Sequence, residues 1–394
     1  MSQADAKITI LHLAVDFNTP HRPRTTTAIE WFVDELGEFE NVVIAYKRTP
    51  RPGPVREVPE AKPAFRLYDF PFFGLPLGLD LLSAMRRAGY RTIARLEADG
   101  VRPSIVHAHK LTFEGLAGWY VARHFGVPLL ISLRGEVETK VFRMKPFLRP
   151  LLRRICGYAS RLYFVSAWFR DEFHHYVPAN SGAERLLPNI VRNIQPAISP
   201  RHGGNAFVSV LNLDTWQRKG LRWLLDGFAH ALAIEPDMRL DIIGGGSAEA
   251  VARVSAMIAK RGLSDTVVLV GAMRNDELLA KLPEYRGLLL PSLNETFGMV
   301  YVEALFAGIP VMFTAGTAID GYLPGLDVAR TVPPRDVAAI AAAIIDLWRN
   351  TEELRANIVA AAPVLFETFD PEAALSRYRQ DVRDIVAAAA RAQE

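Results

Sequence analysis

The chain has 394 residues, enough for two domains, and half of them are hydrophobic, as expected of a globular protein with a sizeable core. A single cysteine, Cys156, excludes an intrachain disulfide and a cysteine-based metal cluster. The net charge is only +3, but residues 1–198 carry 27 Lys and Arg against 19 Asp and Glu, whereas the rest carries 19 against 24. No base-stacking or helix-turn-helix pattern accompanies the basic half, so nucleic acid is not an expected partner.

Short apolar runs alternate with amphipathic stretches along the chain, beginning with a strand predicted over residues 8–15 and a helix over 27–36. Further strands are predicted over 41–46, 104–109, 128–134, 161–166, 206–213, 240–245, 266–271, 287–292 and 310–315. Further helices are predicted over 221–233, 276–282 and 336–348. Strands that are apolar on both faces and alternate with helices are typical of parallel sheets covered by helices.

A polar stretch rich in Pro and Gly, residues 192–205, divides the strands into two sets. We therefore predict an α/β fold of two Rossmann-like, doubly wound parallel-sheet domains facing a central cleft. The predicted domains are residues 1–198 and 199–374. Ligands of such sheets bind outside the carboxyl ends of the strands, so candidate site residues are sought there.

The segment NETFGMVYVEALFAGIPV, residues 294–311, contains two glutamates eight positions apart at a predicted strand-to-helix turn. Glu295 falls in the loop, and Glu303 falls one to two turns into a helix that begins near Gly298. Backbone N–H groups at a helix start bind phosphate, and a glycine lets the phosphate approach closely. A carboxylate accepts hydrogen bonds from vicinal sugar hydroxyls. These residues predict a site for a sugar diphosphate.

The pattern P-S-x-x-E-x-F-G-x-x-x-x-E-A-x-x-x-G-x-P-V in this segment resembles glycosyltransferase family 4. Other segments follow in the family's order, namely IVHAH, FVS with LLPNIVR, RKG with LRWLLDGF, and VVLVGAMRNDELLAKL. The resemblance implies a GT-B fold and retaining transfer of a sugar from a nucleotide sugar, most commonly UDP- or GDP-linked, to a hydroxyl acceptor. It also implies a C-terminal helix, about residues 375–394, that packs back on the first domain.

By this resemblance, Glu303 binds the nucleotide ribose, Glu295 contacts the transferred sugar, and Lys219 neutralises the leaving diphosphate. The residues themselves support Lys219, since a cation before a glycine at a strand-to-helix turn suits a diphosphate. The alternative for each of these residues is a solvated surface charge. The other candidate donor-binding residues are Phe297, Gly298, Met299, Val300, Gly244, Gly245 and Asn212.

The loop before Lys219 departs from the family. The arginine expected five residues upstream is absent, and Asp214 occupies its place. Two alternatives stay open: Arg218 supplies the second cation from an altered loop, or Asn212 marks the equivalent position in a longer turn. We therefore count Arg218 with the catalytic candidates.

The acceptor side departs from the family as well. The first loop carries Arg22, Arg24 and Thr25 where paired glycines are usual, and the loop after PLLISL begins Arg134-Gly135-Glu136 instead of with His. Threonines at a helix start can cap it or hold a phosphate. Arg22, Arg24, Thr25, Arg134 and Glu136 are our candidates for the acceptor side.

Two histidines lie at the end of the third predicted strand, residues 104–109. His107 alternates inward and is predicted to pack in the core, whereas His109 is nearer the predicted cleft and is a catalytic candidate. IIGGGSAE, residues 242–249, is interpreted as a glycine turn at the donor site. An NAD site is disfavoured because Glu249 occupies the third small position. No Asp-x-Asp motif or histidine cluster stands out, so we predict no cofactor and no metal.

Residues 69–91 and 140–161 mix apolar side chains with cations. No run reaches the roughly 20 apolar residues of a membrane span, and no signal peptide is recognised, so a cytoplasmic protein is expected. The basic stretches favour peripheral contact with the anionic inner face of the plasma membrane and a lipid-linked acceptor. The alternative is that they form ordinary helices whose arginine stems cover the core.

Two other functions stay open from the sequence. One is another GT-B activity, such as that of a nucleotide-sugar epimerase, and the other is nucleotide-sugar binding without turnover. Ligand binding without product would favour the second. Nothing in the sequence predicts an oligomeric state.

Overall fold

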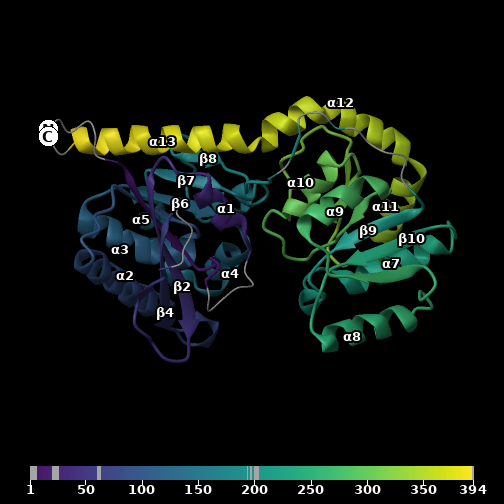
Figure 1. Cartoon of the computed structure of the whole chain (residues 1–394), viewed down its shortest axis with the longest axis horizontal. Helices are drawn as coiled ribbons and strands as arrows, with labels where there is room; N and C mark the ends of the chain where they lie inside the picture. The colour runs from purple at the N-terminus through teal and green to yellow at the C-terminus, as the bar shows by residue number, and fades with distance from the viewer. Residues whose placement is uncertain are drawn as a thin grey trace. The chain divides into compact units, whose positions relative to one another are not determined.

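The computed structural model describes residues 7–19, 26–59, 64–192, 194–195, 198 and 204–392. The chain divides into two compact units (Figure 1). Unit 1 comprises Met1–Val165, Phe169–Ile190 and Pro371–Glu394, and unit 2 comprises Ser166–Trp168 and Val191–Asp370. Each unit is built on its own sheet, and nearly all strand pairs are parallel, which confirms the predicted α/β class.

The sheet of unit 1 has eight strands in the order β3-β4-β2-β1-β5-β6-β7-β8, and only the β3–β4 pair is antiparallel. The strands are β1 (Thr9–Ala14), β2 (Glu40–Thr49), β3 (Arg56–Glu57), β4 (Arg66–Phe73), β5 (Ile105–Ala108), β6 (Leu129–Leu133), β7 (Arg161–Phe164) and β8 (Glu184–Leu186). The helices are α1 (Ala28–Asp34), α2 (Leu81–Ala98), α3 (Leu116–Phe125), α4 (Glu136–Met144), α5 (Arg149–Tyr158), α6 (Phe169–His174) and α13 (Pro371–Arg391). Short helical turns are η2 (Pro76–Gly78), the π-helical turn η3 (Leu111–Gly115) and η4 (Pro146–Leu148).

One face of this sheet packs against α1 and α13. Phe32 of α1 and Tyr378 of α13 meet edge to face with ring centroids 4.8 Å apart, and Val382 joins the same buried cluster. Arg161 of β7 forms an ion pair with Asp381 of α13 at 2.8 Å. Each fully buried apolar side chain contributes roughly 1.5–3 kcal/mol, so these contacts fix the C-terminal helix on unit 1.

The opposite face of the sheet is covered by α3. At Gly118 of this helix, an added Cβ would lie 3.2 to 3.5 Å from Leu13, Leu129 and Val106 of β1, β6 and β5. Side chains alternate between the two faces of a strand, so Ile10 of β1 packs in the α1 and α13 cluster while Leu13 packs under α3. Both faces are therefore apolar, as the strand patterns predicted.

The sheet of unit 2 has six strands in the order β11-β10-β9-β12-β13-β14, and every pair is parallel. The strands are β9 (Ala206–Val210), β10 (Arg239–Ile243), β11 (Val267–Gly271), β12 (Leu288–Leu289), β13 (Val311–Thr314) and β14 (Ala329–Val332). The helices are α7 (Leu221–Leu232), α8 (Ala248–Ala259), α9 (Asn275–Lys281), α10 (Met299–Phe306), α11 (Val337–Arg349) and α12 (Thr351–Phe369), with short turns η5 (Leu213–Thr215) and η6 (Leu282–Glu284). The strand order reverses between β9 and β12, which marks the topological switch point where doubly wound sheets bind ligands.

Every strand and helix that we predicted by range is present, with ends shifted by a few residues. The strands that the sequence did not predict are β3, β4, β8 and β14. The two residues of β3 are both exposed, and β8 and β14 each bury one residue, so none of these strands has an apolar run. Strand β4 was missed because Pro71 interrupts its apolar residues. Its last residues were also counted with the mixed apolar and basic stretch 69–91. None of the described helices has both the length and the apolar character needed to cross a membrane.

Candidate functional site

The candidate residues of unit 2 gather at the switch point of its sheet. Strand β9 pairs with β10 on one side and β12 on the other, so their carboxyl ends are neighbours. The loop after β9 carries Asn212, Arg218 and Lys219, the loop after β10 carries Gly244 and Gly245, and the loop after β12 carries Glu295 and leads into α10. The fold thus brings together three segments far apart in sequence at the edge where ligands bind.

Lys219 and Glu295 form the central contact of this group. The Lys219 Nζ lies 2.5 Å from Glu295 Oε2, and the side chains keep 16% and 17% of their surface exposed. The same loops are joined through the backbone, because the Leu293 N–H donates to the carbonyl of Arg218 at 2.9 Å. An ammonium has three donors, so Lys219 can bond an anionic ligand while it keeps Glu295. The Arg218 side chain is exposed beside this pair.

Gly298 allows the chain to turn from the Glu295 loop into α10. Its φ is 71°, and a Cβ at this position would lie 2.5 Å from the ring of Tyr301 and 3.1 Å from Glu295 Cγ. A larger residue would have to displace that ring or the loop. No acceptor among the described residues bonds the N–H groups of Met299 and Val300, which are therefore free for a phosphate.

Contacts on both sides hold the loop before Gly298 in place. Phe297 is fully buried, and its ring meets that of Tyr322 edge to face at 5.6 Å. The carbonyl of Thr296 accepts hydrogen bonds from Ser166 Oγ at 2.7 Å and Trp168 Nε1 at 3.2 Å. Phe297 therefore anchors the loop through its side chain, while its backbone leads to the helix start.

Glu303 lies in the second turn of α10 with 6% of its surface exposed. Burial raises the pKa of its carboxyl to about 6, and a hydrogen bond from Asn275 opposes that rise. Asn275 is the first residue of α9, in the connection that follows β11. Asn275 was not among the predicted site residues, although an asparagine after a predicted strand is a recognisable signal of a site at the strand's carboxyl end.

The glycine turn after β10 packs directly on the loop after β9. A Cβ on Gly244 would lie 1.8 Å from the Leu211 carbonyl oxygen, so the two backbones approach more closely than any other residue permits. Asp214 Oδ1 accepts from the N–H and hydroxyl of Ser247, and Asn212 Oδ1 accepts from the Asp214 N–H. Asp214 thus has a structural partner in Ser247, the N-cap of α8, which gives a physical reason for an acid at this position.

Unit 1 carries the remaining candidates at the carboxyl ends of β5 and β6. His109 is only 1% exposed, so it is as buried as His107. Arg134 donates from Nε to the His109 carbonyl at 3.0 Å and from a terminal nitrogen to Asn189 Oδ1 at 3.2 Å. Glu136 begins α4 and pairs with Lys140 at 3.0 Å. The other acceptor-side candidates, Arg22, Arg24 and Thr25, lie outside the described residues.

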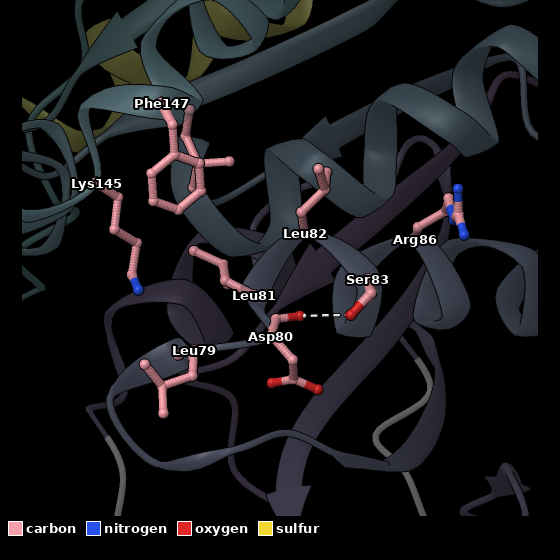
Figure 2. Close-up of a pocket in the computed structure, with 10 residues that line it drawn as sticks. Leu79, Asp80, Leu81, Leu82, Ser83, Arg86, Lys145 and Phe147 are labelled. Carbon is pink, nitrogen blue, oxygen red and sulfur yellow. Dashed lines mark hydrogen bonds between the residues drawn. The ribbon is translucent and has the colours of Figure 1, made fainter.

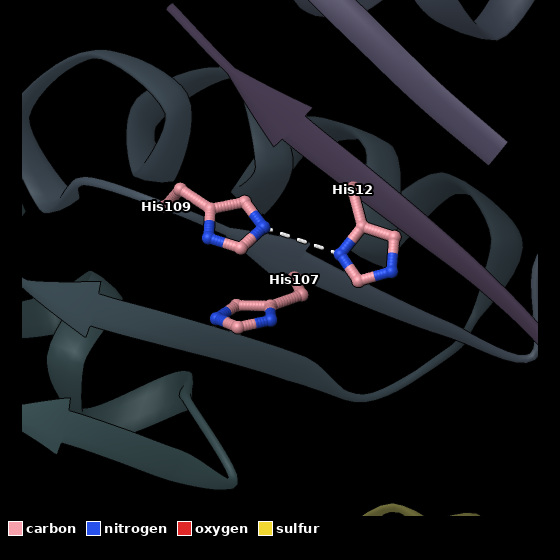
Figure 3. A group of neighbouring side chains, drawn as sticks. All are labelled: His12, His107 and His109. Carbon is pink, nitrogen blue, oxygen red and sulfur yellow. Dashed lines mark hydrogen bonds between the residues drawn. The ribbon is translucent and has the colours of Figure 1, made fainter. Parts of the chain in front are cut away.

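Three histidines of unit 1 meet in the core, an arrangement that the sequence analysis did not predict (Figure 3). Parallel pairing sets His12 of β1 beside His107 of β5, and His109 follows on the same strand end. Burial lowers the pKa of His12 to about 4 and lowers those of His107 and His109 well below the usual value. All three rings are therefore neutral at physiological pH.

The hydrogen bonds of this cluster fix the proton positions of His12 and His109. The amide nitrogen of Asn41 donates to the Leu36 carbonyl at 2.9 Å, so its Oδ1 accepts from His12 Nε2 at 3.2 Å. His12 Nδ1 then accepts from His109 Nε2 at 3.2 Å. His107 bonds the Tyr378 hydroxyl and Ser132 Oγ, each at 2.9 Å. A metal ion would break these bonds, so the cluster fits a neutral hydrogen-bonded network better than a metal site.

Two buried carboxyls near the same strand ends were also missed. Glu114 Oε1 accepts from the Val15 N–H at 2.8 Å, and burial raises the pKa of Glu114 to about 7. Glu138 Oε1 accepts from the Leu111 N–H at 3.2 Å, and burial raises its pKa as well. Glu114 lies in the π-helical turn η3, a feature that is frequent at functional sites. A glutamate inside the apolar run LTFEGLAGW was the available signal.

Comparison with known families shows that two glycosyltransferase models match the chain. A model described as "Glycosyl transferases group 1" matches residues 204–350, and one described as "Glycosyl transferase 4-like domain" matches residues 25–189. Together they cover about four fifths of the chain.

Relatives and solved structures of the same kind are similar to the chain. It is 30% identical to the MMP alpha-(1->4)-mannosyltransferase of Mycolicibacterium hassiacum over 64% of this chain and 63% of that protein. It is 28% identical to the phosphatidyl-myo-inositol mannosyltransferase of Mycobacterium leprae over 68% and 69%, so these alignments span about two thirds of each relative.

The fold is shared with solved structures over nearly their whole length. Sucrose-phosphate synthase of Thermosynechococcus elongatus superposes with a TM-score of 0.74 at 19% identity, covering 97% of this chain and 100% of that one. Anabaena HepE in complex with UDP and glucose superposes with a TM-score of 0.67 at 13% identity, covering 95% and 99%.

Proposed function

The chain belongs to glycosyltransferase family 4 and is a sugar-transferring enzyme with a GT-B fold, and from that membership we propose its donor, mechanism and acceptor. The proposed reaction moves a sugar from a nucleoside-diphosphate sugar, UDP- or GDP-linked, to a hydroxyl of the acceptor with retention of configuration. The observation that carries this proposal is the Lys219–Glu295 pair beside the free N–H groups of α10.

Each part of the proposed nucleotide-sugar donor has a candidate binding residue in unit 2. Glu303 accepts hydrogen bonds from the two ribose hydroxyls, because a carboxylate offers two oxygens to vicinal donors. The N–H groups of Met299 and Val300, next to Gly298, bind the diphosphate. Glu295 contacts the transferred sugar. The presence of UDP and glucose in the HepE structure supports a nucleotide-sugar donor on this fold.

Departure of the nucleoside diphosphate develops negative charge on its β-phosphate oxygen. Lys219 and Arg218 supply positive charge there, and removing one such group typically lowers turnover by about 10²–10³. Retention follows if the acceptor hydroxyl attacks the anomeric carbon from the face that the diphosphate leaves, and the leaving oxygen takes the hydroxyl proton. Arg134 and Glu136 are proposed for the acceptor side, whereas His109, a catalytic candidate from the sequence, is buried in the core and is given no contact with the sugar. We propose that the reaction needs no metal and no cofactor.

The proposed acceptor is a lipid-linked hydroxyl or a glycolipid or polysaccharide intermediate. The phosphatidyl-myo-inositol mannosyltransferase relative supports a lipid acceptor, since its name describes one. We further propose that the enzyme works at the inner face of the plasma membrane as a peripheral protein. The excess of Lys and Arg in residues 1–198 supports contact with an anionic surface.

A transfer assay tests the proposal. The protein is incubated with UDP- and GDP-sugars and phosphatidylinositol-containing vesicles, and the anomeric configuration of the product is read by NMR. An axial-to-axial or equatorial-to-equatorial outcome supports retention, whereas inversion contradicts it. Hydrolysis or epimerisation of the donor would contradict transfer and favour another GT-B activity. Nucleotide binding without any product would favour a nucleotide-sugar-binding protein without turnover.

A further inference from the structure

Two turns of unit 1 expose large apolar side chains to solvent. The β4–α2 turn exposes Leu77 at 81% and Leu79 at 71%, and the last residue of α4 and the turn after it expose Met144 and Phe147 at 71% each. In the described part of the chain these are the four most exposed large hydrophobic side chains. We call them the apolar tip. Clustered exposed apolar side chains mark sites of contact with a membrane or a protein.

The two turns line one groove of about 290 Å³. Figure 2 shows Lys145 and Phe147 on one side, facing Leu79 and Leu81 on the other. Arg86 lies further along α2 and lines the same groove. Residues from the two turns therefore form a single surface, with apolar side chains and cations mixed along it.

Leu77 has a backbone conformation that disfavours a leucine. Its φ is 55° and its ψ is 13°, in the left-handed region that suits glycine. A leucine that is both conformationally disfavoured and exposed contributes little to the stability of this fold. Backbone strain of this kind is found at functional sites such as ligand clamps, so it is a reason to seek a function for Leu77.

The cationic side chains at the groove are available to bind an anion. The side chains of Lys145 and Arg86 make no ion pair or hydrogen bond with any described residue. The carboxylate of Asp80 is already used, since it accepts from the Leu75 N–H at 2.7 Å and pairs with Arg87 at 3.1 Å. Residues 140–161 contain seven Lys or Arg and no Asp or Glu. Three of these seven, Lys140, Arg143 and Arg161, pair with acids of other segments. Among the described residues, the cations that remain unpaired at the groove are Lys145 and Arg86.

We propose that the apolar tip inserts into the interfacial layer of an anionic phospholipid membrane while Lys145 and Arg86 bind lipid phosphates at the groove. This inference rests on the peripheral association in the proposed function and names the surface that makes it. Insertion removes apolar side chains from water, and the cations gain from the negative surface potential. A second copy of the chain is disfavoured as occupant, because an isologous contact would set two cationic surfaces against each other.

The structure also shows which parts of residues 69–91 and 140–161 are available to contact a membrane. Helix α5 buries Leu152, Ile155 and Cys156, and α2 buries eight residues, so the apolar faces of both helices cover the core. The helical parts of 69–91 and 140–161 thus follow the core-covering alternative. The most exposed apolar side chains of both stretches lie at the turns and at the end of α4, and the proposed membrane contact lies there.

Vesicle flotation tests this inference with phosphatidylcholine vesicles that either contain or lack phosphatidylglycerol. The wild type is expected to bind only the anionic vesicles, and salt should weaken the binding. The double variant Leu77→Gly with Phe147→Ser is expected to lose at least about tenfold in affinity, and Lys145→Gln about fivefold. Glycine adopts the backbone of residue 77 freely and Phe147 is 71% exposed, so neither substitution is expected to unfold the protein.

Ile234→Ser is the matched control, because Ile234 is 58% exposed in unit 2 and should not affect binding. The inference fails if the wild type binds neither vesicle, if the tip variants bind as the wild type does, or if Ile234→Ser loses as much. It also fails if sedimentation shows a dimer that the tip variants abolish. Nucleotide titration separates this failure from failure of the proposed function, since tip variants should bind nucleotide normally.

Discussion

Lys219 and Glu295, 76 positions apart in sequence, form an ion pair of 2.5 Å between the loops after β9 and β12. These two strands are neighbours at the switch point of the unit 2 sheet. The pair therefore joins the cation proposed for the leaving diphosphate to the carboxylate proposed for the sugar. Its partial exposure leaves both groups accessible to a ligand.

Lys219→Ala is expected to lower turnover by about 10²–10³ while the protein stays folded, because the developing charge on the diphosphate loses its nearest cation. Initial rates and thermal unfolding are measured on the same preparation. Lys260→Ala, at an exposed lysine that ends α8, is the control and should keep full activity. A near-wild-type rate in Lys219→Ala would remove Lys219 from the mechanism.

Nucleotide affinity is expected to depend on the ionisation of Glu303. The folded pKa of about 6 means that the carboxylate, which accepts the ribose hydroxyls, is lost as pH falls below that value. Affinity should therefore decline by up to about tenfold per pH unit below 6. Calorimetric titration across this range provides the measurement.

The phosphates of the nucleotide titrate in the same range, so Glu303→Gln is measured in parallel. The variant should bind more weakly and lack the Glu303 part of the pH dependence. Identical pH profiles for wild type and variant would show that Glu303 does not bind the nucleotide through its carboxylate.

Glu114 is expected to make the stability of the protein fall with rising pH. Its folded pKa of about 7 lies above the ordinary value of 4.5, so the folded state binds the extra proton between these values. The stabilisation is present below the unfolded pKa and is lost as pH rises through 7. The full effect is about 3 kcal/mol.

Glu114→Gln retains the shape of the side chain but does not titrate. The unfolding midpoint of this variant relative to the wild type should be higher at about pH 8 than at about pH 5. Thermal unfolding at both pH values gives this difference directly. A difference that does not change with pH would show that Glu114 is ionised in the folded protein at both.

The cluster of His12, His107 and His109 is expected to be free of metal, because five of its six ring nitrogens are hydrogen-bonded and Arg134 opposes a nearby cation. Elemental analysis of the purified protein should find well under one transition metal per chain. Turnover should be the same with and without EDTA. One tightly bound metal that is lost in His12→Asn would contradict both expectations.

The sequence was sufficient for most apolar strands of the two sheets but not for the polar edge strands or for contacts between distant segments. Apolar strands with their helices were predictable from periodicity, whereas polar edge strands such as β14 carry no such signal. Glu303 was recognisable by its spacing from Glu295, yet its partner Asn275 depends on how α9 packs near α10. His12 joins the histidine cluster only through the parallel register of β1 and β5, which one sequence does not fix.

The apolar tip is another feature that depends on tertiary packing and could not be located from the sequence alone. The sequence showed apolar residues mixed with cations in two stretches, but only the fold separates the buried faces of α2 and α5 from the exposed turns. From the sequence alone, Asp214 was only a departure from the family pattern before Lys219. Its contacts with Ser247 show that it has a structural role. Local patterns identified the chemistry, and tertiary packing decided which side chains are available for it.

The most direct measurement is a binding titration of UDP, GDP, ADP, CMP and dTDP compounds to the wild type and to Glu303→Ala, with and without Mg²⁺. One nucleotide should bind and stabilise the wild type, Mg²⁺ should make no difference, and Glu303→Ala should abolish the effect. Equal binding by the variant, or binding that requires Mg²⁺, would contradict a metal-independent donor site built on the Lys219–Glu295 pair and α10.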